Sequence, residues 1–125
     1  MDNKKTILIA EDEKAYRTVL QNKLQSAGVN ILLAENGEQA LKVINDSKPD
    51  LIMLDLIMPI KDGFEVLREI KENNLAADMK IVVLSNLGQA EDIDKAKNLG
   101  AIDYIIKTET DLSDAVKKIL TYLET

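Results

Sequence analysis

Residues 49–55, Pro49-Asp50-Leu51-Ile52-Met53-Leu54-Asp55, contain a short apolar run that ends in a carboxylate. The run Leu51–Leu54 is too short for a helix, and it is continuously apolar instead of alternating with polar residues. This pattern predicts a strand that is buried on both faces, as strands are in parallel sheets.

Four similar apolar runs lie on either side of this one: Thr6–Ala10, Val29–Ala34, Ile81–Leu84 and Ala101–Ile106. The segments between the runs have apolar residues at helical spacing. Four of these stripes are Tyr16, Val19, Leu20 and Leu24; Ala40, Leu41 and Ile44; Phe64, Leu67 and Ile70; and Leu112, Ala115, Val116, Ile119, Leu120 and Leu123. The helix predicted near Ala90–Leu99 has a thinner stripe and lacks a decisive capping residue, which indicates local mobility.

Several residues predict where the helices begin and end. Asn36, followed by Gln39, and Asp62, followed by Glu65, have the pattern of N-caps with a polar partner three residues later. Gly28 and Gly100 each lie between a predicted helix and the next strand, where a glycine commonly ends the helix. The resulting order is βαβαβαβαβα, which predicts a parallel sheet with helices on both faces.

Length and composition limit the function. The 125 residues predict one domain, 1–125, with no output domain. A net charge of −6 argues against direct binding to nucleic acid or an anionic membrane. No apolar run is long enough for a signal peptide or a membrane span, so we expect a cytoplasmic protein. With no His and no Cys, any chemistry must use carboxylates, hydroxyls, amides and lysines.

Acidic residues follow the first and third predicted strands. Glu11 and Asp12 follow the first run, and Asp55 follows the third. Sites in open α/β sheets form at the carboxyl ends of the strands, so these carboxylates converge if strands one and three are neighbours. Such a cluster repels itself unless a cation is bound. Oxygen ligands with an incomplete protein shell suit Mg²⁺, which keeps waters and accepts a phosphate oxygen.

The other predicted strands also end in polar residues, namely Glu35, Ser85-Asn86 and Lys107. Each residue alone has a structural interpretation. Asp12 could cap the first helix and Asp55 could be a turn residue, while Ser85 is common at strand ends and Lys107 could be a solvated charge. The joint occurrence of acids, a hydroxyl and an amine at four converging strand ends favours a functional site.

Several of these segments resemble those of a known family. Ile7–Glu13 resembles an opening strand followed by an acidic pair, and Pro49–Pro59 resembles a phosphoacceptor segment with Met-Pro after the Asp. Asp62-Gly63 matches the turn into the third helix. The remaining matches are Ser85, 30 residues after Asp55, and the pair Tyr104 and Lys107. Together they resemble the receiver domain of two-component response regulators.

This resemblance implies a fold and a set of roles. The fold would be a doubly wound (βα)5 flavodoxin-like three-layer sandwich with strand order 2-1-3-4-5. Asp55 would accept a phosphoryl group. Asp12, Asp55 and the backbone carbonyl of Ile57 would bind Mg²⁺ with help from Glu11. Lys107 would pair with Asp55 and then with a phosphoryl oxygen.

The resemblance also implies a switch. Ser85 would hydrogen-bond the phosphoryl group, and Tyr104 would move inward, which changes the surface of the fourth helix, fifth strand and fifth helix. The protein would catalyse only its own phosphorylation and dephosphorylation. Expected partners are a histidine kinase or a histidine phosphotransfer protein and a downstream effector, with the chain a monomer or weak dimer. The sequence does not name them.

Three departures from the family pattern affect rates. Thr108 replaces the proline that usually follows Lys107, and a cis bond before a non-proline residue costs about 2.5–4 kcal/mol, so we expect a trans bond. Asn86 occupies a position where the family has a small residue. Ile57 and Leu87 are apolar at positions that flank the phosphoryl group, which predicts slow hydrolysis.

Two alternatives differ in class. One is a degenerate receiver that acts as a phosphorylation-independent adaptor. The other is an enzyme on the same fold. A haloacid-dehalogenase-type phosphatase needs Asp-x-Asp, but Ile57 stands two residues after Asp55, and a flavodoxin needs a Ser/Thr/Gly-rich loop where this chain has Glu11-Asp12. Both enzymes are disfavoured.

Overall fold

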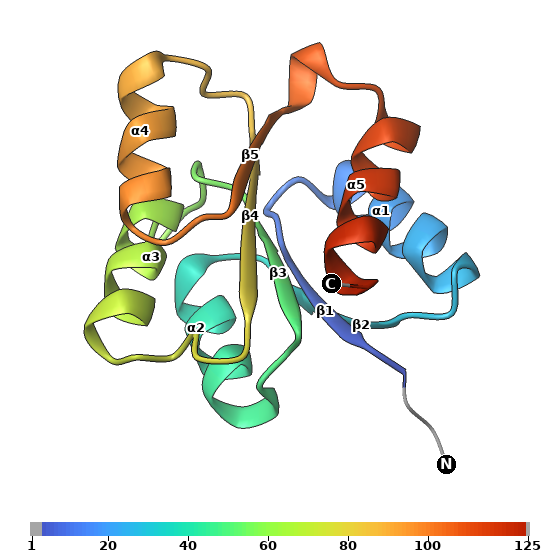
Figure 1. Ribbon diagram of the computed structural model, residues 1–125, viewed down its shortest axis with the longest axis horizontal. Helices are drawn as coiled ribbons and strands as arrows, with labels where there is room; N and C mark the ends of the chain where they lie inside the picture. Colours follow the sequence, from blue (N-terminus) through green and yellow to red (C-terminus); the bar gives the residue numbers. More distant parts are fainter. Residues whose placement is uncertain (1–3, 125) are drawn as a thin grey trace.

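Five parallel strands form one sheet in the order β2-β1-β3-β4-β5 in the computed structural model, which describes residues 4–124 (Figure 1). The strands are β1 (Thr6–Ala10), β2 (Asn30–Ala34), β3 (Leu51–Leu54), β4 (Lys80–Ser85) and β5 (Asp103–Ile106). The helices are α1 (Lys14–Ser26), α2 (Gly37–Ser47), α3 (Gly63–Glu72), α4 (Ala90–Asn98), the 3₁₀ turn η1 (Lys107–Glu109) and α5 (Leu112–Glu124). The predicted flavodoxin-like fold and strand order are confirmed.

The register of the strands brings their carboxyl ends together. Ala10 at the end of β1 pairs with Ala34 of β2 on one side and with Leu54 of β3 on the other. The strands β1 and β3 begin and end as predicted. Because β1 and β3 are neighbours, the residues that follow Ala10 and Leu54 meet at one edge of the sheet.

Each face of the sheet has its own apolar core. In Figure 1, α1 and α5 cover one face, and α2, α3 and α4 cover the other. Alternate residues of β1 divide between the two cores: Ile7 and Ile9 pack with Leu20 of α1, while Leu8 packs with Leu67 of α3. The continuous apolar runs therefore arise because both faces of every central strand are buried.

The predicted capping residues are confirmed. The backbone N–H of Gln39 donates to Asn36 Oδ1 at 2.8 Å, and that of Glu65 donates to Asp62 Oδ1 at 2.9 Å. Gly28 and Gly100 have φ angles of 83° and 112°, in the left-handed region that favours glycine after a helix. The capping residues that the sequence predicts are therefore the ones at which α2 and α3 begin.

The predicted apolar stripe of α1 is partly wrong. Val19 was expected to face the core, but its side chain is 42% exposed. Arg17 lies on the buried face instead, in phase with Leu20 and Leu24. Position 17 faces inward because residues separated by three and seven positions share one side of a helix.

The helix α4 is the least embedded of the five. Ala96 is its one buried residue, and its N-cap, Gln89, makes no side-chain capping bond. These features match the thin stripe that the sequence shows. Within residues 4–124, no helix is long and apolar enough to cross a bilayer. The same residues contain no cis peptide bond, so the Lys107–Thr108 bond is trans as predicted, and the chain continues there through η1.

Candidate functional site

Three carboxylates meet at the carboxyl edge of the sheet, as the order of the strands requires. Glu11, Asp12 and Asp55 each place one carboxylate oxygen within 4.8 Å of the other two. Glu11 and Asp55 are buried, and Asp12 is exposed. The predicted convergence is confirmed. A set of three oxygen donors that is open on one side has the chemistry of a Mg²⁺ site with waters completing the shell.

Asp12 does not cap α1. The N-cap residue is Glu13, whose side chain makes no capping bond. The interpretation of Asp12 as a helix cap is therefore wrong, and its exposed carboxylate lies beside the two buried ones. Asp12 thus offers the cluster a carboxylate that has no capping role.

Lys107 neutralises part of the cluster. Its Nζ donates to Glu11 Oε1 and to Asp55 Oδ2, the latter at 3.2 Å, and its side chain is buried. The Nζ also lies 4.5 Å from the centre of the Tyr16 ring, a favourable position for a cation. The contact with Asp55 was predicted, but the contact with Glu11 was not. One cation is shared between two buried acids, and the third acid has no part in this pair.

Burial changes the proton affinity of this pair. Burial is the largest cause of the pKa shift of Glu11, and the negative charge of Asp55 acts in the same direction. The hydrogen bond from Lys107 opposes them, but the pKa is still raised from 4.5 to about 7. Burial also lowers the pKa of Lys107, but the hydrogen bond to Glu11 and the charge of Asp55 outweigh it and leave that pKa raised. Lys107 is therefore a cation at neutral pH, and Glu11 titrates near neutrality.

The residues predicted to switch meet at one backbone position. Ser85 is fully buried, and its Oγ accepts a hydrogen bond from the N–H of Leu87 at 3.4 Å. The hydroxyl of the half-buried Tyr104 donates to the carbonyl of Leu87. Burial raises the pKa of Tyr104 to about 12, so this donor keeps its proton. Side chains from β4 and β5 thus hold the loop that precedes α4.

The three positions predicted to tune rates lie on the loops that follow β3 and β4. Ile57 is 53% exposed, and its N–H donates to Asp55 Oδ1 at 3.2 Å. Asn86 is exposed, and Leu87 is half-buried against the core. Ile57 and Leu87 therefore present apolar side chains on the two loops that follow β3 and β4.

Close packing fixes the loop that carries Asp55. A Cβ on Gly63 would lie 2.4 Å from the carbonyl oxygen of Asp55 and 2.7 Å from Leu56 Cα. A Cβ on Gly37 would lie 2.1 Å from the carbonyl oxygen of Lys61, to which the Gly37 N–H donates at 3.0 Å. Only glycine permits these approaches, because in both cases the opposing atoms belong to the backbone.

Sequence reasoning missed Arg17. This buried residue donates from Nη1 to the carbonyl of Glu11 at 2.7 Å and from Nη2 to Glu35 Oε1 at 3.3 Å. The spacing of position 17 from Leu20 and Leu24 was the available signal. It was passed over because a charged residue is usually assigned to the solvent face.

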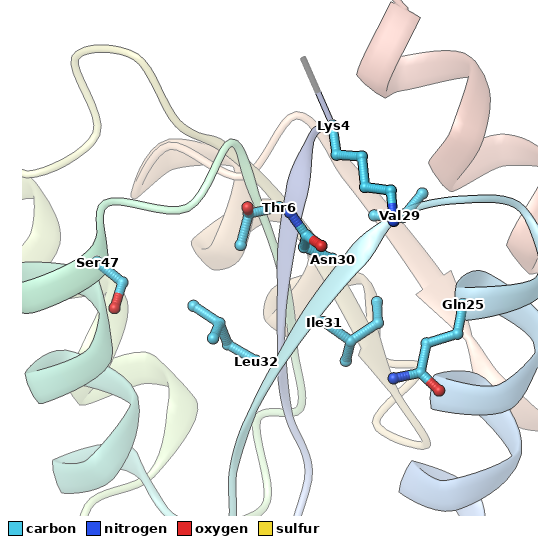
Figure 2. Close-up of a pocket in the computed structure, with 8 residues that line it drawn as sticks. All are labelled: Lys4, Thr6, Gln25, Val29, Asn30, Ile31, Leu32 and Ser47. Atoms are coloured by element: carbon cyan, nitrogen blue, oxygen red, sulfur yellow. The ribbon is translucent and has the colours of Figure 1, made fainter. Parts of the chain in front are cut away.

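The cavity drawn in Figure 2 lies away from these residues. Its volume is about 640 Å³, and its lining includes Thr6 at the start of β1 and Asn30 and Ile31 at the start of β2. These residues stand at the amino ends of their strands, opposite to the acidic cluster. The cavity has no part in the chemistry of the cluster.

Comparisons with known proteins agree with this geometry. The family model of the response regulator receiver domain matches residues 7–119. The phosphate regulon transcriptional regulatory protein PhoB of Pseudomonas aeruginosa is 42% identical over 103 residues, 82% of this chain but 45% of that protein, so the chain spans less than half of that relative. The chemotaxis protein CheY of Halobacterium salinarum is 35% identical over 119 residues, 94% of this chain and 98% of that protein.

A solved structure adds a likeness in three dimensions. A two-component response regulator from Clostridium difficile superposes with a TM-score of 0.88 at 30% identity, covering 97% of each chain. The matched family segment contains the acidic cluster, Lys107 and the loop after β4. The chain belongs to the response regulator receiver domain family.

Proposed function

We propose that this chain is a signalling switch that accepts a phosphoryl group on Asp55. The observation that carries the proposal is the meeting of Glu11, Asp12, Asp55 and the Lys107 ammonium at one edge of the sheet. Asp55 is the acid that follows the central strand β3; like Glu11 it pairs with Lys107, and its Oδ1 accepts the N–H of Ile57. Asp55 is thus held as a nucleophile between a cation and a backbone donor.

Different residues of the chain have different roles in the phosphoryl transfer. Glu11, Asp12, Asp55 and the carbonyl of Ile57 would hold Mg²⁺, which when bound supplies positive charge that offsets the charge of the phosphoryl group. Lys107 supplies a second positive charge and, once Asp55 carries the phosphoryl group, can donate to a phosphoryl oxygen. We assign no further catalysis to the chain beyond its own phosphorylation and dephosphorylation.

The response to phosphorylation would pass through Leu87. Ser85 and Tyr104 both bond its backbone, so a movement of Ser85 toward the phosphoryl group changes the support of the loop before α4. The weakly embedded α4 then shifts with β5 and α5, and this surface meets an effector protein. Hydrogen exchange with and without beryllofluoride should differ most over residues 86–106, and changes confined to residues 13–48 would contradict the assignment.

The proposal includes the context of the domain. We propose that residues 1–125 act as the receiver unit and exchange phosphoryl groups in the cytoplasm with a histidine kinase or a histidine phosphotransfer protein. The lengths of the relatives support both a free-standing receiver and one unit of a longer regulator, because CheY is matched over 98% of its length and PhoB over 45%.

One experiment tests the phosphorylation site. Incubation with acetyl phosphate and Mg²⁺ should add the mass of one phosphoryl group, and Asp55→Asn should remove this addition. Asp62→Asn is a matched control, because it changes an acid in the same loop while retaining an oxygen that can cap α3. Full labelling of Asp55→Asn, or loss of labelling in Asp62→Asn alone, would contradict the assignment.

A further inference from the structure

Arg17 is a buried charge that the proposed phosphoryl transfer does not use. It lies in the first turn of α1, where its own N–H makes a helical hydrogen bond to the carbonyl of Glu13 at 3.0 Å. Its side chain extends back past the start of the helix to the carbonyl of Glu11 and also reaches Glu35. It therefore joins the loop after β1 to the loop after β2.

The ion pair with Glu35 alone does not explain this arrangement. A cation near the amino end of a helix opposes the helix dipole, and a buried guanidinium loses its hydration. The ion-pair partner Glu35 has a side chain that is 63% exposed, so the ion pair contributes little to the stability of the fold. An apolar side chain would fill the same stripe beside Leu20 and Leu24 without these costs, but it could not donate to the Glu11 carbonyl.

The bond to Glu11 controls the orientation of one peptide group. The carbonyl of Glu11 and the N–H of Asp12 belong to the same rigid plane. On the other side of Glu11, its N–H donates to the carbonyl of Ala34 at 3.0 Å, and Glu11 Oε2 accepts the N–H of Glu13 at 3.1 Å. Arg17 thus completes the set of contacts that fixes the backbone between the two acids.

We propose that Arg17 is a positioning residue, which holds the Glu11–Asp12 peptide so that both carboxylates are preorganised beside Asp55 for a divalent cation. This inference rests on the proposed function, because it concerns the same Mg²⁺ site. Arg17 acts through the backbone of Glu11 and touches neither the carboxylates of the cluster nor the attacking oxygen. Without it, the exposed Asp12 has to be ordered when the ion binds, which lowers affinity.

Calorimetric Mg²⁺ titrations of the parent, Arg17→Met and Arg17→Lys test the proposal. Arg17→Met should weaken binding about tenfold, as the loss of groups that orient metal ligands commonly does. Arg17→Lys should fall between the two, because an ammonium can donate to the Glu11 carbonyl but lacks the fork that reaches Glu35 as well. Lys14→Met is the matched control: it removes an exposed charge from the same turn of α1, and binding should not change.

Two further measurements separate positioning from general damage. The phosphorylation rate with acetyl phosphate at saturating Mg²⁺ should stay within about twofold of the parent in Arg17→Met, because the loss is in ion binding. In metal-free protein, the amides of residues 12 and 13 should exchange faster in Arg17→Met, with the core of the sheet unchanged. Equal Mg²⁺ affinity in the parent and a folded Arg17→Met would overturn the proposal.

A second variant covers the case in which Arg17→Met does not fold. Glu35→Ala keeps Arg17 but removes one of its two anchors, and it should weaken Mg²⁺ binding about threefold, below the effect of losing the arginine. Unchanged affinity in Glu35→Ala would then overturn the role of the arginine bridge. If the parent binds no Mg²⁺ at all, the proposed function fails instead, so the two failures are distinguishable.

Discussion

The two halves of the carboxyl edge of the sheet are built differently. At the ends of β1 and β3, the backbone is fixed: the N–H of Asp55 donates to the carbonyl of Ala10, and Gly63 packs directly against the carbonyl of Asp55. At the ends of β4 and β5, the loop before α4 is held by the side chains of Ser85 and Tyr104, and α4 buries one residue.

This difference separates chemistry from response. Reacting groups need a fixed geometry, which neighbouring strands and close backbone packing supply. A surface that changes shape needs few buried contacts, so that its rearrangement costs little free energy. The receiver places its acids on the first half and its least embedded helix on the second, and Lys107 reaches from the second half to the first.

The largest expected effect comes from filling the space at two glycines, one in each half. Gly63→Ala should lower the free energy of unfolding by about 3 kcal/mol and reduce phosphorylation, since its methyl group would meet backbone atoms of Asp55 and Leu56. Gly88→Ala, in the loop before α4, would meet side-chain atoms of Ile106 at 3.3 Å and should change stability by less than about 1 kcal/mol. Urea titrations measure both, and equal losses would remove the contrast between the halves.

A smaller effect on stability should follow from Mg²⁺ binding at the ends of β1 and β3. Lys107 offsets part of the charge of the three acids, so an ion should stabilise the fold. With an assumed Kd on the order of 1 mM, about 10 mM Mg²⁺ adds about 1.4 kcal/mol. Asp12→Ala should remove most of this gain without lowering the metal-free melting temperature, because Asp12 does not cap α1.

Thermal melts at matched ionic strength measure this Mg²⁺ response. Asp78→Ala is a control, because it removes an exposed acid from the opposite edge of the sheet. A destabilised Asp12→Ala that keeps the full Mg²⁺ response would exclude Asp12 from the ion site.

A pH dependence of stability should come from Glu11. Burial raises its pKa from 4.5 to about 7 in the folded protein, so between these pH values the folded state binds more protons than the unfolded state. In metal-free buffer, the free energy of unfolding contributed by Glu11 should therefore fall as pH rises from 4.5 to 7. Glu11→Gln should flatten this slope, which denaturant titrations across that range measure. If the free energy of unfolding has the same pH slope in the parent and in Glu11→Gln, the raised pKa is contradicted.

The smallest predicted effect compares one position from each half. Ile57→Asn and Leu87→Glu each introduce a polar group that can orient an attacking water. Each should therefore speed loss of the phosphoryl group about threefold, which corresponds to a decrease of less than about 1 kcal/mol in the activation free energy. Decay of phosphorylated protein after removal of the donor measures the rates. A double variant that decays no faster than the parent would show that neither position controls hydrolysis.

The sequence predicted most of the fold because its local signals agree. The strands β1 and β3 have the predicted bounds, and the caps Asn36 and Asp62 make the expected bonds. Strand β5 is shorter than its apolar run, because Ala101 and Ile102 precede the paired residues. Apolar periodicity reports burial, but it does not determine which residues pair with the neighbouring strand.

The candidate site was harder to predict in detail. The three acids follow from strand order, but the contact of Lys107 with Glu11 depends on how far the lysine side chain extends from the end of β5 past β4 and β3 to the end of β1. Arg17 was missed because its burial depends on a carbonyl acceptor that the fold supplies, and no periodic pattern of apolar residues contains that information. Val19 was misplaced because an apolar residue beside the buried stripe was preferred to a charged residue within it.

The stacking of Lys107 against Tyr16 has a spectroscopic consequence. The chain has no Trp, so its ultraviolet emission comes from three tyrosines. Tyr16 is the one whose ring lies 4.5 Å from the ammonium that contacts both buried acids. Any ion or group that draws Lys107 away alters the electric field at that ring, so Tyr104→Phe combined with Tyr122→Phe leaves a protein whose remaining fluorophore reports occupancy of the site without an added label.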